Sequence, residues 1–209
     1  MQIVIPLFDR FTALDAVGPY QVLTRLPGSE VIFSSERPRG VCDDSGSLTL
    51  VADASFGDVP HPDIIVVPGG PGQAGQMTPG PLQDWLIEAD KTTTWTTSVC
   101  TGALILAAAG LLKGREATTY WLARDELARL GAKSVQERYV FDGKYVTAAG
   151  VSAGIDMALA LAGRIAGDKF AQQIQLGIEY DPQPPYNAGA EAGAPPEVAA
   201  AFRAKSRFT

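Results

Sequence analysis

A single cysteine lies where a predicted strand gives way to a predicted helix. Cys100 occupies the middle of the segment SVCTG, in which Ser98 precedes it by two residues and Gly102 follows it by two. Small residues at these positions are what a tight strand-to-helix turn around a nucleophile requires. A helix N-terminus favours a thiolate, and the backbone N–H of Thr101 could stabilise an oxyanion. A free cysteine is often only a packing residue, but this setting favours a nucleophile.

The thiol of Cys100 needs a group that moves its proton, and Asp15 is the candidate. The only histidine, His61, precedes the apolar strand DIIVV, and five extended residues place it roughly 16 Å from the reactive edge of the sheet. Asp15 follows the first predicted strand and belongs to the same edge as Cys100. A carboxyl group in an apolar pocket can act as a general base or acid near neutral pH. Thr12 and Asp15 also have the spacing of a capping box, so helix capping stays open as the alternative.

A glycine-rich loop follows the strand DIIVV. Residues 70–75, GPGQAG, match the dinucleotide pattern G-x-G-x-x-G, and Asp90 lies further along the chain. No helix begins at these glycines, and Pro71 lacks a donor that a pyrophosphate would need, so dinucleotide binding is not expected. Two interpretations remain: a tight loop without further role, or a loop whose Gly70 N–H is a second oxyanion donor beside Thr101.

The composition excludes several other kinds of site. The chain has 209 residues, 46% of them hydrophobic, and a formal charge of −6, so it presents no general attraction to nucleic acid or anionic lipid. Two cysteines and one histidine provide neither a disulfide framework nor a zinc site, and no metal or organic cofactor is expected. Cys42 lies beside Asp43 and Asp44, whose charges oppose a thiolate. The apolar runs are too short to span a membrane, so we expect a soluble cytoplasmic protein.

Strands and helices alternate along the chain. Strands are expected over residues 2–8, 30–35, 62–70 and 92–99, and hairpins over 39–53 and 137–150. Helices are expected over residues 12–26, 80–91, 101–112, 119–131, 152–167 and 168–180, with a last short helix within 195–206. This alternation predicts an α/β fold with a parallel, doubly wound sheet.

The carboxyl ends of the parallel strands should form the functional edge, because ligands of such sheets bind there. Residues 9–15, Gly69–Gly70, Cys100 and Ala149–Gly150 all follow predicted strands, and we expect them to converge with Cys100 near the centre. The chain shows no internal repeat and no linker before residue 181. We expect one domain over residues 1–189 and a C-terminal tail over residues 190–209.

Five segments resemble the DJ/PfpI superfamily, and in particular its isonitrile (isocyanide) hydratase branch. They are LDAVGPYQVL, IIVVPGGPG, SVCTGALILAAAGLLKGREATTYW, AAGVSAGIDMALALA and IEYDPQPPYNAG. The resemblance implies a flavodoxin-like α/β sandwich and a homodimer. It further implies that Cys100 is the nucleophile and Asp15 the acidic group facing it. Thr101 follows the nucleophile as in the hydratases, and Gly70 matches the loop that lends a backbone N–H to the site.

The resemblance also implies a reaction. A cysteine and a carboxylate would add water to a small, neutral isocyanide through a covalent thioimidate and release an N-substituted formamide, which is hydro-lyase chemistry. Tyr120 stands where relatives often carry histidine, so a mechanism that needs a Cys–His pair is not expected; Tyr120 and Gly150 are candidate pocket residues. The alternatives are a glyoxalase- or deglycase-like enzyme and a cysteine-based redox or metabolite sensor. A DNA-binding regulator is disfavoured because no helix-turn-helix region follows residue 189.

Overall fold

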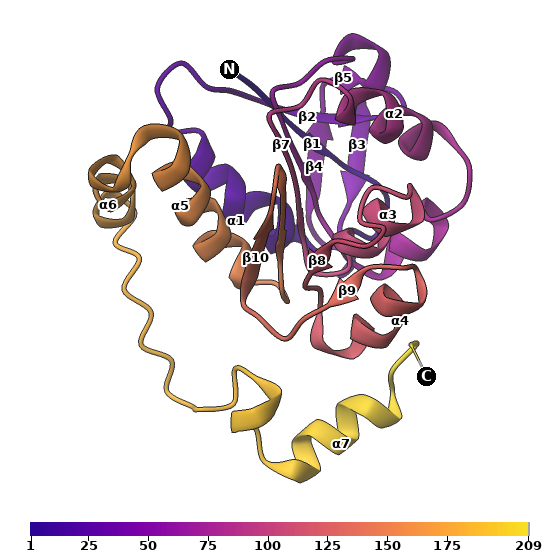
Figure 1. The fold of residues 1–209 in the computed structure, drawn as a ribbon, viewed down its shortest axis with the longest axis vertical. Helices are drawn as coiled ribbons and strands as arrows, with labels where there is room; N and C mark the ends of the chain where they lie inside the picture. Colours follow the sequence, from indigo (N-terminus) through magenta and orange to yellow (C-terminus); the bar gives the residue numbers. More distant parts are fainter. Residues whose placement is uncertain (209) are drawn as a thin grey trace.

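A seven-stranded sheet forms the centre of the computed structural model, which describes residues 1–208 (Figure 1). The strand order is β10-β11-β7-β6-β1-β2-β5, and all neighbours are parallel except β10 and β11. The strands are β1 (Gln2–Pro6), β2 (Glu30–Ser35), β5 (Ala54–Ser55), β6 (Ile64–Val67), β7 (Trp95–Val99), β10 (Tyr139–Asp142) and β11 (Tyr145–Ala148). The run β2-β1-β6-β7-β11 has the flavodoxin-like order, which confirms the predicted fold class.

Helices cover both faces of this sheet (Figure 1). On one side α1 packs against α5, and α6 packs against α5 in turn; on the other side lie α2, α3 and α4. The helices are α1 (Ala13–Leu23), α2 (Pro81–Asp90), α3 (Gly102–Ala108), α4 (Arg124–Arg129), α5 (Ala153–Ala166), α6 (Asp168–Gly177) and α7 (Pro196–Ala204). Short 3₁₀ turns are η1 (Phe56–Asp58), η2 (Pro71–Gln76), η3 (Trp121–Ala123) and η4 (Glu191–Gly193). Within residues 1–208, no helix combines the length and the apolar character needed to cross a membrane.

The centre of the core is the pair of neighbouring strands β6 and β7. All four residues of β6 are fully buried, because helices cover the sheet on both sides. This explains why its sequence, IIVV, is continuously apolar and does not alternate with polar residues. Two small sheets flank the core: β3 (Arg39–Cys42) with β4 (Thr49–Ala52), and β8 (Glu116–Ala117) with β9 (Lys133–Ser134). The two predicted hairpins are present as β3–β4 and β10–β11.

Two helices fall furthest short of the length that the sequence pattern predicts. The helix expected over residues 101–112 ends at Ala108, because Gly110 takes a left-handed conformation with φ of 80°. The N–H groups of Gly110 and Leu111 then bond the carbonyls of Ala107 and Leu106, which is a Schellman motif.

The helix expected over residues 119–131 is reduced to η3 and α4. Thr118 and Thr119 are instead held by bonds to other elements. The Thr118 N–H donates to Thr147 Oγ1 at 2.9 Å, and the Thr119 hydroxyl donates to the carbonyl of Cys100 at 2.8 Å. These tertiary hydrogen bonds outweigh the local helical pattern.

The end of the chain crosses beside the body of the molecule. Residues 181–190 are exposed and contain neither helix nor strand, and in Figure 1 they stand away from the sheet. The chain then forms α7, which lies within the range expected for the last short helix. The final residue of the expected tail, at position 209, lies outside the described residues. We call residues 188–208 the C-terminal segment.

Candidate active site

Cys100 lies in the tight turn between β7 and α3. Its φ is +57°, a left-handed conformation that costs free energy for any residue with a Cβ atom. The Cys100 N–H is held by the carbonyls of Ala148 and Ala149, at 3.1 and 3.0 Å, where β11 ends. A Cβ atom at Gly102 would come within 2.1 Å of the Val67 carbonyl oxygen, so only glycine fits there. The turn predicted around Cys100 is therefore present, and packing against two neighbouring strands holds it.

Asp15 reaches the same edge of the sheet from the first turn of α1. Its side chain is fully buried, and its Oδ2 accepts the N–H of Gly69 at 2.9 Å. Its Oδ1 has no hydrogen-bond partner in the described residues. The capping-box alternative is wrong, because the Thr12 hydroxyl donates to Asp44 and caps no helix N–H. Asp15 therefore carries a buried oxygen that no N–H group of the described residues holds, on a carboxyl group that interacts with the Cys100 side chain.

The ionisation of Asp15 and that of Cys100 are coupled. Burial raises the pKa of Asp15 to about 7, against the smaller lowering effects of the Gly69 N–H and the Cys100 side chain. Burial also raises the pKa of Cys100 well above its ordinary value, and the charge of Asp15 raises it further. The pair therefore titrates as a unit in which, near neutral pH, the thiol keeps its proton beside a partly ionised carboxyl group.

The start of α3 lowers the pKa of Cys100, as expected, but other effects on this pKa are larger. The N–H groups of Thr101 and Val151 both lower the pKa of Cys100. Desolvation and the Asp15 charge outweigh them, so the resting cysteine is a thiol and not a thiolate. A thiol of this kind reacts as a nucleophile only after a base has removed its proton.

The glycine loop after β6 holds both Asp15 and Thr101. The Gly69 N–H bonds Asp15, and the Gly70 N–H donates to the Thr101 hydroxyl oxygen at 3.0 Å. A Cβ atom at Gly69 would lie 2.5 Å from the Thr101 nitrogen, and one at Gly70 would lie 2.5 Å from the Thr12 nitrogen. The Gly70 N–H is thus occupied, and it could bind an oxyanion only by releasing Thr101. The loop supports two residues of the site through its backbone.

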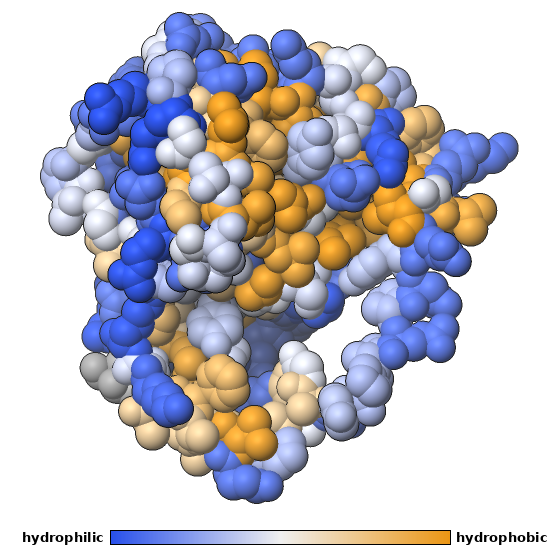
Figure 2. Space-filling model, turned by 180° about the vertical axis from the view of Figure 1, so that it is seen from behind, coloured by the Kyte–Doolittle hydropathy of each residue, from blue (hydrophilic) through white to orange (hydrophobic). Residues whose placement is uncertain are grey.

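A cavity of about 520 Å³ lies beside the turn that holds Cys100. Tyr120 and Gly150 both line it, and their contact is close, because a Cβ atom at Gly150 would come within 2.8 Å of the Tyr120 ring. Burial raises the pKa of Tyr120, and a thiolate at Cys100 would raise it further. The C-terminal segment supplies the opposite wall, including Val198 and Phe202. Figure 2 shows the hollow between this segment and the body.

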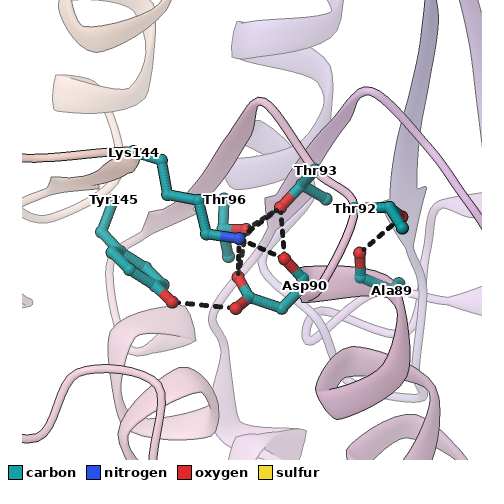
Figure 3. Close-up of polar contacts among 7 residues, drawn as sticks. All are labelled: Ala89, Asp90, Thr92, Thr93, Thr96, Lys144 and Tyr145. Carbon is teal, nitrogen blue, oxygen red and sulfur yellow. Dashed lines mark hydrogen bonds and ion pairs between the residues drawn. The ribbon is translucent and has the colours of Figure 1, made fainter.

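Three residues that the sequence analysis considered lie outside the region of Cys100 and Asp15. His61 is exposed before β6, at the edge opposite to Cys100, and Cys42 ends β3. Asp90 ends α2 and takes part in a buried polar cluster (Figure 3). Its carboxylate accepts the Thr96 hydroxyl at 2.6 Å and the Tyr145 hydroxyl at 2.8 Å, and it pairs with Lys144 at 3.2 Å. Asp90 therefore joins α2 to β7 and β11, far along the sheet from the glycine loop.

Arg207 is a residue of this region that no sequence pattern indicated. Its guanidinium donates to the carbonyls of Pro71 and Gly70, at 2.6 and 2.9 Å, and to Gln73 Oε1 at 2.9 Å. It is more than 100 residues from Cys100 in the sequence and belongs to no motif around it. Only the path of the C-terminal segment brings it to the glycine loop.

The fold and the tight turn at Cys100 define a flavodoxin-like α/β protein with a cysteine between β7 and α3, and comparison with known proteins identifies its family. The chain belongs to the DJ-1/PfpI family, whose model matches residues 1–164. The family prediction is thereby confirmed.

Among individual proteins, the chain is 41% identical over 198 residues to the isonitrile hydratase of Pseudomonas putida, covering 95% of this chain and 86% of that protein. It is 30% identical over 154 residues to a deglycase of Pyrococcus abyssi, covering 70% of this chain and 89% of that protein. Its structure matches the crystal structure of a ThiJ/PfpI family protein from Pseudomonas syringae with a TM-score of 0.95 and 35% identity. That match covers 98% of this chain and 85% of that one.

Proposed function

We propose that this protein is an isonitrile hydratase, which adds water to a small, neutral isocyanide and releases an N-substituted formamide. The observation that carries the proposal is the buried pair of Cys100 and Asp15, a thiol beside a carboxyl group whose pKa is raised to about 7. The similarity to the isonitrile hydratase of Pseudomonas putida supports the choice of substrate. The activity is that of a hydro-lyase.

In the first step Cys100 adds to the terminal carbon of the isocyanide, R–N≡C. Asp15 takes the thiol proton through its free Oδ1 as the sulfur attacks, and passes it to the same carbon. A carbon–sulfur bond and a carbon–hydrogen bond form, and the product is the thioimidate R–N=CH–S–Cys100. No net charge is created, which suits a buried site.

In the second step water replaces the sulfur. Asp15 accepts a proton from water, whose oxygen adds to the thioimidate carbon, and passes that proton to the nitrogen. The tetrahedral carbon then carries OH, NHR and sulfur. Its collapse breaks the carbon–sulfur bond, the hydroxyl proton returns to Cys100 through Asp15, and R–NH–CHO leaves. The Thr101 N–H, which already favours negative charge on the sulfur, assists its departure.

The cavity beside Tyr120 and Gly150 is suited to hold the R group. Its volume of about 520 Å³ exceeds that of the reacting N≡C unit alone, and much of its lining is apolar, including Leu14, Val198 and Phe202. A neutral, apolar substituent would be desolvated there at little cost.

Turnover of an isocyanide by the Cys100→Ala variant tests the proposal. The wild-type protein should convert an aryl isocyanide to the formamide, followed by absorbance, and the variant should be inactive with an unchanged circular dichroism spectrum. Mass spectrometry of the wild-type protein during turnover should locate the thioimidate on Cys100. An adduct on Cys42 alone, or near wild-type turnover by the variant, would reject the assignment.

Deglycase activity is the second candidate, and the 30% identity to the Pyrococcus abyssi deglycase favours it. Assay of methylglyoxal beside the isocyanide separates the two candidates. A redox sensor is less well supported, because a sensor requires a readily formed thiolate, whereas burial and Asp15 raise the pKa of Cys100.

The protein is further proposed to act as a cytoplasmic homodimer that binds neither nucleic acid nor membranes. The formal charge of −6 opposes binding to polyanions. Figure 2 shows apolar side chains gathered on one face, as an interface between subunits would require. Light scattering coupled to gel filtration measures the mass directly, and a monomer would reject the dimer.

A further inference from the structure

The last described residues return to the active site. Arg207 forms three hydrogen bonds with residues 70–73, two of them to backbone carbonyls. Phe208 packs against the core, and the Arg207 guanidinium lies 4.8 Å from the centre of its ring. Arg207 and Phe208 are thus held beside the glycine loop and the core by both polar and apolar contacts.

Arg207 contacts the loop through its carbonyl groups, and two residues of the site contact it through its N–H groups. Arg207 bonds the carbonyls of Gly70 and Pro71, whereas the N–H groups of Gly69 and Gly70 bond Asp15 and Thr101. A displacement of the loop would therefore move the carboxyl group of Asp15 relative to Cys100. A flat guanidinium with two donors to neighbouring carbonyls restrains both the position and the tilt of the peptide units.

We propose that Arg207 is a positioning residue for the hydration reaction, which holds the Gly69–Gly70 loop so that Asp15 stays aligned with Cys100. This inference rests on the proposed function. It adds a residue that takes no part in the bond-making or proton-transfer steps of the proposed reaction. The charge of Arg207 also attracts the thiolate form of Cys100. Removal of Arg207 should thus affect both the alignment and the electrostatics of the site.

The rest of the C-terminal segment has its own attachment to the body. Arg124 and Glu191 form an ion pair at 2.5 Å, and Trp121 packs edge-on against Phe202 with ring centres 6.4 Å apart. Arg203 also pairs with Glu191 and lies over the Trp121 ring, and in the described residues it forms no hydrogen bond or ion pair with the glycine loop. Arg203 therefore provides a matched control: the same residue type in the same segment, without the contact in question.

The test compares Arg207→Ala, Arg207→Lys and Arg203→Ala in the full-length protein. For Arg207→Ala we expect kcat for an isocyanide to fall about 10- to 100-fold, as expected for a misplaced catalytic group, while KM changes less than about threefold. Arg207→Lys keeps the charge but loses the two-pronged bond, so its kcat should fall nearly as far. Arg203→Ala should keep kcat within about twofold of wild type.

A second readout does not depend on the substrate. The rate at which iodoacetamide alkylates Cys100 is measured against pH in each variant. The profile of Arg207→Ala should move to higher pH, because the thiolate loses a nearby positive charge, while Arg207→Lys and Arg203→Ala should keep the wild-type profile. The other ionisable groups that interact with Cys100, Asp15 and Tyr120, are unchanged in all variants.

Two results would overturn the inference. One is an Arg207→Ala enzyme with wild-type kcat; the other is an equal loss in Arg207→Ala and Arg203→Ala, which would assign the effect to the segment as a whole. If the wild-type protein hydrates no isocyanide, the proposed function fails. The alkylation profiles then still decide whether Arg207 acts on Cys100.

Discussion

Replacement of Asp15 by asparagine should remove activity and increase stability together. The asparagine side chain has nearly the same shape, and its amide oxygen can accept the Gly69 N–H that Asp15 Oδ2 accepts at 2.9 Å. It cannot accept the Cys100 proton. We expect kcat to fall by about 10²- to 10⁴-fold, the usual contribution of a general base. Loss of the negative charge should also lower the pKa of Cys100 and speed its alkylation.

The gain in stability follows from the buried carboxyl group. The pKa of Asp15 is about 7 in the folded protein against 3.8 for an ordinary aspartate, so the folded state binds the proton more tightly than the unfolded chain. Stability linked to that proton is fully present below pH 3.8 and is lost as pH rises through 7. The loss is on the order of 4 kcal/mol at pH 8 and on the order of 2 kcal/mol at pH 5. Asparagine does not titrate and escapes this loss.

Urea unfolding at pH 5 and pH 8 measures the effect. The free energy of unfolding of Asp15→Asn should exceed that of wild type by about 2 kcal/mol more at pH 8 than at pH 5, because only the wild type ionises a buried group. The wild-type kcat should also fall with pH below about 7, as Asp15 becomes protonated. An Asp15→Asn protein with wild-type pH dependence of stability, or with kcat within tenfold of wild type, would refute the assignment of Asp15 as the buried base.

Three further substitutions test the structure around the site. Gly102→Ala should lower the free energy of unfolding by about 3 kcal/mol or more in urea, since its methyl group would overlap the Val67 carbonyl; a loss below about 1 kcal/mol would contradict the packing. Tyr145→Phe removes a donor from the buried Asp90 carboxylate and should cost about 1–3 kcal/mol in the same assay. Tyr120→Phe keeps the ring in the cavity wall, so kcat should stay within about threefold of wild type; a larger loss would assign the hydroxyl a role in the reaction.

Much of the site could be predicted because parallel strands end at one edge. The positions of Cys100, Asp15 and Gly70 after three different strands were sufficient to bring them together, and the small residues around Cys100 indicated the turn. The position of His61 before its strand likewise placed it at the other edge. These inferences depend only on the strands being parallel and on which end of its strand each residue follows. The alternation of strands and helices in the sequence predicts both.

Other features depend on contacts between distant segments, which local patterns do not encode. The shift in the pKa of Cys100 is one such feature, because burial, and not the helix N-terminus, decides the direction of the shift. The non-helical course of Thr119 is another, since its hydrogen bond to the Cys100 carbonyl replaces the start of the helix expected over residues 119–131. Arg207 is the third, because its role depends on the path of the C-terminal segment.

The three glycines around Cys100 and Asp15 have a consequence for how the enzyme can change. Gly69, Gly70 and Gly102 each face backbone atoms at distances where no added methyl group fits. Val198 and Phe202, by contrast, line the cavity from a helix at the surface. Substitutions that change the substrate range should therefore be tolerated on α7. Substitutions at the three glycines should not be tolerated.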